Sequence, residues 1–261
     1  MTDIIQTQTS NNITTITLNR PDVHNAFNED VIAALTTAFE TAGNDKNVRA
    51  VVLRGNGKSF CAGGDLNWMR KSADYTREQN IEDAMQLGHL LRLIYTLPKV
   101  TIALVQGNAF GGGVGLTACC DIAIAEDTAR FSLSEVRIGL IPSIIAPYVI
   151  ASIGERQSRR YFMTAERFGA DEAKRIGLVH ETVAAGGLDA TCDNITAEIL
   201  QGAPGAQARG KKLLLGIAKA EISDDIVRKT VEEIADARAS DEGKEGLSAF
   251  LDKKEPSWRK R

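Results

Sequence analysis

Two glycine-rich segments have the residue types and spacing for anion chemistry. They are Ala62-Gly63-Gly64 and Gly111-Gly112-Gly113, and each lies between a short apolar run and a stretch with helical character. Glycine allows a sharp turn and a close approach of ligand to backbone, and a helix N-terminus presents unpaired N–H groups at the positive end of its dipole. If the two turns converge, one N–H from each could bind a single oxyanion. Such turns are, on base rates, more often just tight packing.

Other ligand classes have weaker support in the sequence. Neither segment matches the G-x-G-x-x-G dinucleotide pattern or the G-x-x-x-x-G-K-[ST] phosphate loop. The four cysteines and three histidines have no zinc-site spacing, so we expect no metal site. We expect Cys119 and Cys120, adjacent in an apolar stretch, to be core residues. The net charge of -3 argues against a nucleic-acid partner, and the basic C-terminal end is typical of a solvated tail.

Helices and strands alternate in the first half of the chain, which predicts an α/β fold with a largely parallel sheet. The expected strands are 13–18, 50–53, 100–105, 122–125 and 130–133. The expected helices are 28–44, 74–95, 114–119, 146–153, 155–162, 170–176, 188–201, 205–217 and 223–237. The strand–glycine-turn–helix plan of 53–66 returns at 104–119. Helices dominate the second half, so we expect residues 1–200 to form a core and 201–261 a helical extension.

The composition is that of a soluble globular protein, with 43% hydrophobic and 25% charged residues. The N-terminal residues have neither the basic nor the apolar region of a secretory signal. No apolar run is long enough to span a bilayer. We therefore predict a cytoplasmic protein with no membrane partner.

The chain resembles the enoyl-CoA hydratase/isomerase (crotonase) superfamily from about residue 4 to residue 258. Each motif is common on its own, and together, in this order and spacing, they are specific. The matching segments are Leu18-Asn19-Arg20-Pro21, Asn25-Ala26-Phe27, 60–66, 107–113, Cys120-Asp121, 135–142 and 173–179. The resemblance implies a ClpP-like spiral of ββα units, a C-terminal helical trimerisation region, and a homotrimer or a hexamer built as a dimer of trimers. The substrate would be an acyl-CoA thioester, with coenzyme A as part of the substrate and no separate cofactor.

The resemblance also assigns residues. Gly64 and Gly112 would supply the two oxyanion N–H groups. Ala62 and its neighbours Gly63, Asp65 and Leu66 would meet coenzyme A. Lys253, or its neighbour Lys254, resembles the family's C-terminal lysine that approaches the phosphates of coenzyme A.

Glu135 matches the position of a catalytic glutamate in this family. Its neighbours in sequence are apolar, and burial among them would raise the carboxyl pKa and suit a proton shuttle. The neighbours expected to bury it are Phe131, Leu133, Ile138, Leu140 and Ile141. The alternative is a surface ion pair of Glu135 with Arg130 or Arg137.

The sequence departs from the family pattern at two places. Hydratases of the family carry a further glutamate two positions after the glycine triplet, and here Gly115 stands there. After Pro142, the common Gly-Gly-Thr-Gln is replaced by Ser143-Ile144-Ile145-Ala146. A single glutamate also fits the Δ3,Δ2-enoyl-CoA isomerases of the superfamily.

Several stretches look like a bacterial branch of methylglutaconyl-CoA and isohexenylglutaconyl-CoA hydratases. They are 65–70, 110–116, 133–140 and 154–161. A substrate with a distal carboxylate needs a cationic or hydrogen-bonding partner, and Arg70, Lys71 and Tyr75 are the candidates. The alternative for Arg70 and Lys71 is a solvated helix face.

Three functions remain open from the sequence. The first is a hydratase acting on a branched, carboxylated 2-enoyl-CoA, with 3-methylglutaconyl-CoA of leucine degradation as the expected substrate. The second is an isomerase that uses Glu135 alone. The third is a non-enzymatic role such as RNA binding, which the acidic balance of the chain disfavours.

Overall fold

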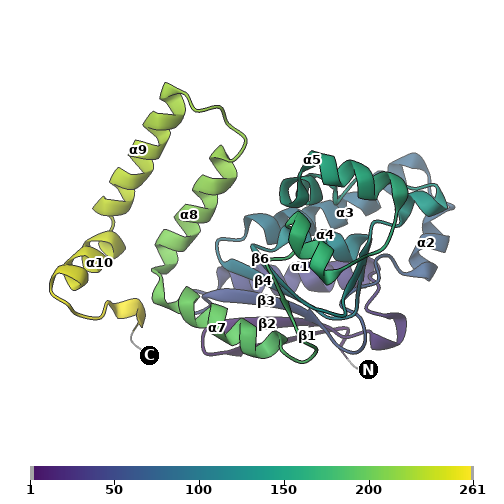
Figure 1. Ribbon diagram of the computed structural model, residues 1–261, viewed down its shortest axis with the longest axis horizontal. Coiled ribbons are helices and arrows are strands. Elements are labelled where there is room, and N and C mark those ends of the chain that lie inside the picture. Colours follow the sequence, from purple (N-terminus) through teal and green to yellow (C-terminus); the bar gives the residue numbers. More distant parts are fainter. Residues whose placement is uncertain (1–2, 260–261) are drawn as a thin grey trace.

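A twisted six-stranded sheet organises the protein (Figure 1), in a computed structural model that describes residues 3–259. Its strands run in the order β1-β2-β3-β4-β6-β9. Their bounds are β1 Ile5–Ser10, β2 Ile13–Leu18, β3 Ala50–Gly55, β4 Val100–Val105, β6 Ile122–Glu126 and β9 Glu181–Val183. β1 and β2 pair antiparallel, and every later neighbour pairs parallel. The prediction of a largely parallel α/β sheet is confirmed.

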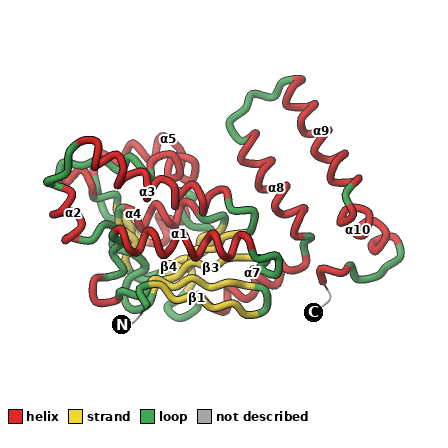
Figure 2. The backbone as a smooth tube through the Cα atoms, turned by 180° about the vertical axis from the view of Figure 1, so that it is seen from behind, coloured by secondary structure: helices red, strands yellow, loops and turns green. Residues whose placement is uncertain are grey.

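Side chains of the central strands alternate between two hydrophobic cores, as the strand period of two requires. Val51 and Leu53 of β3 belong to the large core, which α1 (Glu29–Asn44) and α3 (Arg77–Thr96) cover. Ala50 and Val52 belong to a smaller core under α7 (Leu188–Gln201). Figure 2 shows α1 and α3 along the same side of the sheet. Helices therefore cover both faces, which explains why the parallel strands are almost wholly apolar.

A second, three-stranded sheet stands beside the first and repeats its plan. It is built from β5 (Asn108–Phe110), β7 (Arg130–Ser132) and β8 (Phe168–Gly169) in that order. β4 leads into β5 and then into α4 (Gly112–Cys119), while β3 leads through the first glycine segment into α2 (Leu66–Ser72). The predicted repeat of strand, glycine turn and helix is therefore present.

The chain after β7 is mostly helical, as predicted, with the short strands β8 and β9 between its helices. The helical elements are η2 (Glu135–Ile138), α5 (Ala146–Thr164), α6 (Ala170–Ile176), α7, α8 (Pro204–Ile217), α9 (Asp224–Ala239), α10 (Asp241–Leu251) and η3 (Ser257–Arg259). α5 spans the two predicted helices 146–153 and 155–162, with Gly154 in a non-helical conformation between them (φ 74°, ψ 162°). Glycine adopts this positive φ without the steric cost of a Cβ.

Helices α8, α9 and α10 form an arm that extends away from the sheet (Figures 1 and 2). Two cations, Arg49, which is buried, and Lys211, which is partly buried, fasten its base. Arg49 donates to the carbonyls of Ile199 and Gly202 at the end of α7. Lys211 of α8 donates to Asp121 at 2.7 Å, and the same Asp121 oxygen accepts from Thr101. The arm is thus fixed at its root, while many of its apolar side chains are exposed.

Several elements were not predicted: the short strands β5, β8 and β9, of two or three residues each, and the longer segments β1, α2 and α10. β1 is polar and exposed apart from its first residue, and it pairs only with β2, so it lacks the apolar alternation of a half-buried strand. α2 has no buried residue, and α10 has one, so neither shows a strong apolar face within the single chain. These segments depend on pairing and capping for their structure.

Candidate active site

The two glycine segments lie side by side. Cys61 and Ala109 form a parallel bridge, with the Cys61 N–H donating to Asn108 O at 3.1 Å and the Phe110 N–H donating to Cys61 O at 3.0 Å. A Cβ added to Gly63 would lie 3.7 Å from the Gly112 nitrogen. The convergence expected of the two turns is therefore present, and backbone hydrogen bonds hold it.

The N–H groups of Gly64 and Gly112 have no backbone acceptor within residues 3–259. Gly112 is the first residue of α4, where the helix itself offers no carbonyl. Gly64 bridges Phe27, but the bonds of that bridge use the neighbouring peptide groups, from Phe27 N to Gly63 O and from Asp65 N to Phe27 O. Two unpaired donors from adjacent turns are the components of an oxyanion hole.

Close packing makes glycine necessary at the second turn. A Cβ on Gly112 would lie 2.1 Å from the Phe27 ring, and one on Gly113 would lie 2.2 Å from Cys61 O. Gly111 has a φ of +50°, a conformation that side chains disfavour. The first turn differs, because a Cβ on Gly64 would only touch Trp68 at 3.5 Å.

Glu135 lies beside the second turn. Gly111 donates to Ser132 O at 2.8 Å, and a Cβ on Gly111 would lie 3.0 Å from Glu135 Oε1. The other carboxylate oxygen, Oε2, is buried and has no hydrogen-bond partner within the described residues. Burial raises the pKa of Glu135, as a proton shuttle needs.

The structure excludes the alternative of a surface ion pair at Glu135, and it corrects part of the expected apolar cover. No ion pair to Arg130 forms, because that guanidinium donates to the carbonyls of Thr128 and Ala129, and Arg137 is exposed without an ion pair to Glu135 in the described chain. Phe131 and Leu133 are buried as expected, but Ile138, Leu140 and Ile141 are exposed and do not cover the carboxylate. Gly111, in the turn that precedes α4, borders the carboxylate instead.

The position of the missing glutamate is filled by a neighbouring side chain. A Cβ on Gly115 would lie 2.2 Å from Ile145 Cγ2 and 2.9 Å from Ile145 Cβ. Ile145 is only 3% exposed. The two departures from the family pattern, at residue 115 and at residues 143–146, are therefore in direct contact.

Asp65 holds the first turn in place. Its carboxylate caps α2 by accepting from the N–H groups of Asn67 and Trp68, and it pairs with Arg20 at 2.9 Å. Burial acts to raise the pKa of Asp65, but these hydrogen bonds outweigh it and the pKa is lowered. The Asn19-Arg20-Pro21 and Gly64-Asp65 motifs, far apart in sequence, thus meet in one ion pair next to Gly64.

The candidate partners of a distal carboxylate do not form one cationic group. Arg70 is exposed and donates to Asn67 at 3.0 Å, and Lys71 pairs with Glu29. Tyr75 lines a cleft between α1 and α3 whose charged side chains are all acidic: Glu29, Asp30, Glu82 and Asp83. Leu66 is exposed beside the first turn. Lys253 follows directly after α10, and Figure 1 shows α10 at the far side of the arm from α2 and α4, the helices that the two glycine turns precede.

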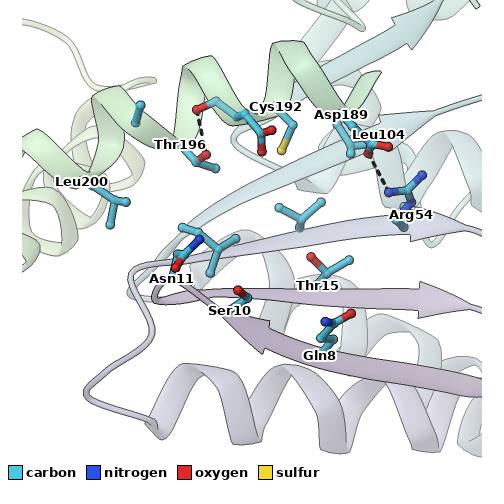
Figure 3. Close-up of a pocket in the computed structure, with 14 residues that line it drawn as sticks. Gln8, Ser10, Asn11, Thr15, Arg54, Leu104, Asp189, Cys192, Thr196 and Leu200 are labelled. Atoms are coloured by element: carbon cyan, nitrogen blue, oxygen red, sulfur yellow. Dashed lines mark hydrogen bonds and ion pairs between the residues drawn. The ribbon is translucent and has the colours of Figure 1, made fainter. Parts of the chain in front are cut away.

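A separate polar cleft of about 430 Å³ lies between the other face of the sheet and α7 (Figure 3). Its Arg54 and Asp189 neutralise each other at 2.7 Å. Its thiol, Cys192, has a pKa raised to about 11 by burial and so stays protonated at neutral pH. The other carboxylate that lines the cleft, Asp193, is exposed, unlike the buried oxygen of Glu135.

No group of three or more potential metal ligands occurs within residues 3–259. No helix in that range is both long and apolar enough to cross a membrane. The cysteines at 61, 119, 120 and 192 are free thiols. Cys119 is a core residue as expected, whereas Cys120 is partly buried and packs against the core.

The family model for enoyl-CoA hydratase/isomerase matches residues 8–261. The chain belongs to the enoyl-CoA hydratase/isomerase family. Enoyl-CoA hydratase ACTT6 of Alternaria alternata is 32% identical over 245 residues, covering 93% of this chain and 80% of that protein. Among solved structures, an enoyl-CoA hydratase from Shewanella pealeana is 41% identical with a TM-score of 0.96, over 98% of this chain and 96% of that one. Pseudomonas aeruginosa AtuE is 35% identical with a TM-score of 0.94, over 99% and 100%.

The family fixes the fold and the general chemistry of this chain. The crotonase fold predicted from the sequence motifs is confirmed. Sequence reasoning did not find the contribution of Phe27, whose ring sits on Gly112, or that of Ile145. The signal for Phe27 was its place in the Asn25-Ala26-Phe27 motif. The signal for Ile145 was the irregular stretch after Pro142.

Proposed function

We propose that this member of the family hydrates a 2-enoyl-CoA thioester, with Glu135 as its acid–base group. The observation that carries the proposal is the buried carboxylate beside two unpaired backbone N–H groups. The names of the relatives, among them enoyl-CoA hydratases of 32% and 41% identity, support hydration.

In this proposal the thioester oxygen accepts hydrogen bonds from Gly64 and Gly112. Glu135, ionised, takes a proton from a water molecule whose oxygen attacks C3, and the C2=C3 electrons move to the thioester oxygen as an enolate. The enolate then collapses as C2 takes a proton from Glu135. The carboxylate is regenerated, and one water has been added. The two donors stabilise the charge where it develops, which is typically worth about 3 kcal/mol for each donor.

A branched, carboxylated acyl group such as that of 3-methylglutaconyl-CoA is the proposed substrate, with isohexenylglutaconyl-CoA as a longer relative. The support is the branch-specific motifs of the sequence. Arg70 is exposed and free of ion pairs within the described chain, so it is the candidate partner for the distal carboxylate. Comparing hydration of 3-methylglutaconyl-CoA and crotonyl-CoA in wild type and in Arg70→Ala tests this. Equal effects of the variant on both substrates would exclude Arg70 as that partner.

Replacing Glu135 by Gln tests the acid–base assignment. The variant should lose at least about 100-fold in kcat, because general acid–base catalysis contributes 10²–10⁴-fold. Binding of a CoA ester should remain close to normal. The control is Glu155→Gln, an exposed carboxylate on α5, which should behave as wild type. Near-normal turnover by the Glu135 variant would refute the mechanism.

Isomerisation of a 3-enoyl-CoA is the second candidate, and one contact favours it. Ile145 occupies the place of a second carboxylate, and one carboxylate is sufficient to move a proton between two carbons. Turnover in H₂¹⁸O separates the candidates. A hydratase puts ¹⁸O on C3 of the product, whereas an isomerase incorporates none.

A trimeric or hexameric assembly and a cytoplasmic location belong to the same proposal. The exposed apolar side chains of the arm are typical of a surface that another subunit covers. They include Val227, Val231, Phe250 and Leu251. In such an assembly the arm of one subunit could bring Lys253 to the coenzyme A of its neighbour. Light scattering at working concentration tests the assembly, and a monomer would refute it.

A further inference from the structure

One wall of the site lies next to Glu135 and is formed by the start of α4. In this wall, Ile145 occupies the space that a side chain at residue 115 of α4 would need. Gly115 and Gly111 are joined by a hydrogen bond of the first turn of α4, from Gly115 N to Gly111 O at 3.2 Å. They are therefore one turn apart, about 5.4 Å along the axis. Gly111 borders the carboxylate of Glu135, and Gly115 borders Ile145.

Ile145 reaches this wall through a short, ordered connection from Glu135. Leu140 N donates to Glu135 O, Ser143 N donates to Ile141 O, and Val149 N donates to Ile145 O at the start of α5. Pro142, within this connection, is buried. The position of Ile145 is therefore fixed on both sides of the residue.

The neighbouring isoleucine points elsewhere. Ile144 Cγ2 lies 3.9 Å from the place of a Cβ on Gly88, so it contacts α3 at an ordinary distance. Ile145 Cγ2 lies 2.2 Å from the place of a Cβ on Gly115, which no real Cβ could tolerate. Only one of the two isoleucines excludes a side chain from α4.

We propose that Ile145 and Gly115 form a matched pair: Ile145 fills the volume beside Glu135 with hydrocarbon, and this makes Glu135 the single side-chain acid–base group on that wall. Ile145 is then a positioning residue that limits which groups can reach the reacting carbons. This inference rests on the proposed function of Glu135 and deepens it.

Within residues 3–259, no charged side chain that we find near this wall pairs with Glu135. Arg130 of β7 donates to backbone carbonyls, Arg167 stacks on the Phe110 ring at 5.2 Å, and Arg137 of η2 is exposed. The first turn of α5 carries no acidic residue, and α4 carries no charged residue. The pKa of the Glu135 carboxyl therefore depends chiefly on how well the wall excludes water, in agreement with burial as the largest cause of its raised pKa.

A thermal-stability cycle tests the pair without any turnover. Gly115→Ala should lower Tm by roughly 5 °C in wild type, because the new methyl overlaps Ile145. In an Ile145→Ala background the same change should cost clearly less, because only the contact with Cβ at 2.9 Å remains, and in an Ile144→Ala background it should cost as much as in wild type. Should Ile145→Ala prove too unstable, Ile145→Leu, which keeps the volume and removes the Cγ2 branch, serves the same purpose. Equal losses in all backgrounds would overturn the pair.

A second measurement tests the effect on Glu135. Its carboxyl can be titrated by infrared difference spectroscopy against Glu135→Gln. Ile145→Thr should shift the midpoint to lower pH by admitting a polar group to the wall, and Ile144→Thr should not. An unchanged midpoint in Ile145→Thr would overturn the proposal. If the stability cycle shows no coupling between residues 115 and 145 and the enzyme is still a hydratase, this inference alone is refuted. If the coupling is present but turnover does not need Glu135, the proposed function is refuted.

Discussion

Gly112→Ala should damage both the fold and the oxyanion hole, through one contact. The added Cβ would lie 2.1 Å from Phe27 Cζ and 2.6 Å from Cε1. Normal carbon–carbon contacts are about 3.5–4.0 Å, so the ring or the turn must move by more than about 1 Å. Phe27 is 3% exposed and packs on Trp68 with ring centroids 6.0 Å apart, which leaves it little room.

The expected magnitude follows from these two consequences. Overpacking of this kind costs about 1–3 kcal/mol of unfolding free energy. If the strain moves the Gly112 N–H, the enolate loses one preorganised donor, and kcat should fall about 10²–10³-fold. Urea unfolding and steady-state hydration of an enoyl-CoA measure the two effects separately.

Matched glycine variants make this prediction sharp. Gly64→Ala should leave stability unchanged, because its Cβ meets Trp68 at 3.5 Å, an ordinary contact. Gly210→Ala, in α8 with nothing within 4 Å, should be neutral or stabilising by up to about 1 kcal/mol. Phe27→Leu should recover part of the stability lost in Gly112→Ala. Wild-type stability and kcat in Gly112→Ala would refute the reasoning.

Three further perturbations test other parts of the structure. Glu135→Gln should stabilise the fold at neutral pH. Because the pKa of Glu135 in the folded protein is raised above its ordinary 4.5, the wild type loses stability as the pH rises from 4.5 to the folded pKa. Urea unfolding at a series of pH values should therefore show the variant's stability advantage growing over this pH range and then levelling off. Arg49→Met should cost about 2–4 kcal/mol by leaving carbonyls of α7 unpaired, and protease should then cut the arm first; an arm as resistant as in wild type would contradict this anchor. Lys211→Met should destabilise by about 2–4 kcal/mol and Lys211→Met with Asp121→Asn by less, as a denaturation cycle can measure.

The sequence by itself determined the elements with strong apolar periodicity. The strands 13–18 and 100–105 and the helices 170–176 and 188–201 have the predicted bounds, because their side chains alternate or recur with the period of the element. The glycine clusters predicted two tight turns, and the ordered motifs predicted the family. These features depend on residues that are close together in the sequence, so they can be predicted without knowing the tertiary contacts.

Only the tertiary structure decided how the site is closed. Glu135 borders Gly111 at the start of α4, whereas three of its apolar neighbours in sequence, Ile138, Leu140 and Ile141, are exposed. Asp65 meets Arg20 across 45 residues, and Ile145 meets Gly115 across 30. Contacts between residues far apart in the chain leave no periodic signal in the sequence. The sequence showed the departures at residue 115 and at residues 143–146 separately, and only the folded chain shows that Gly115 and Ile145 are in contact.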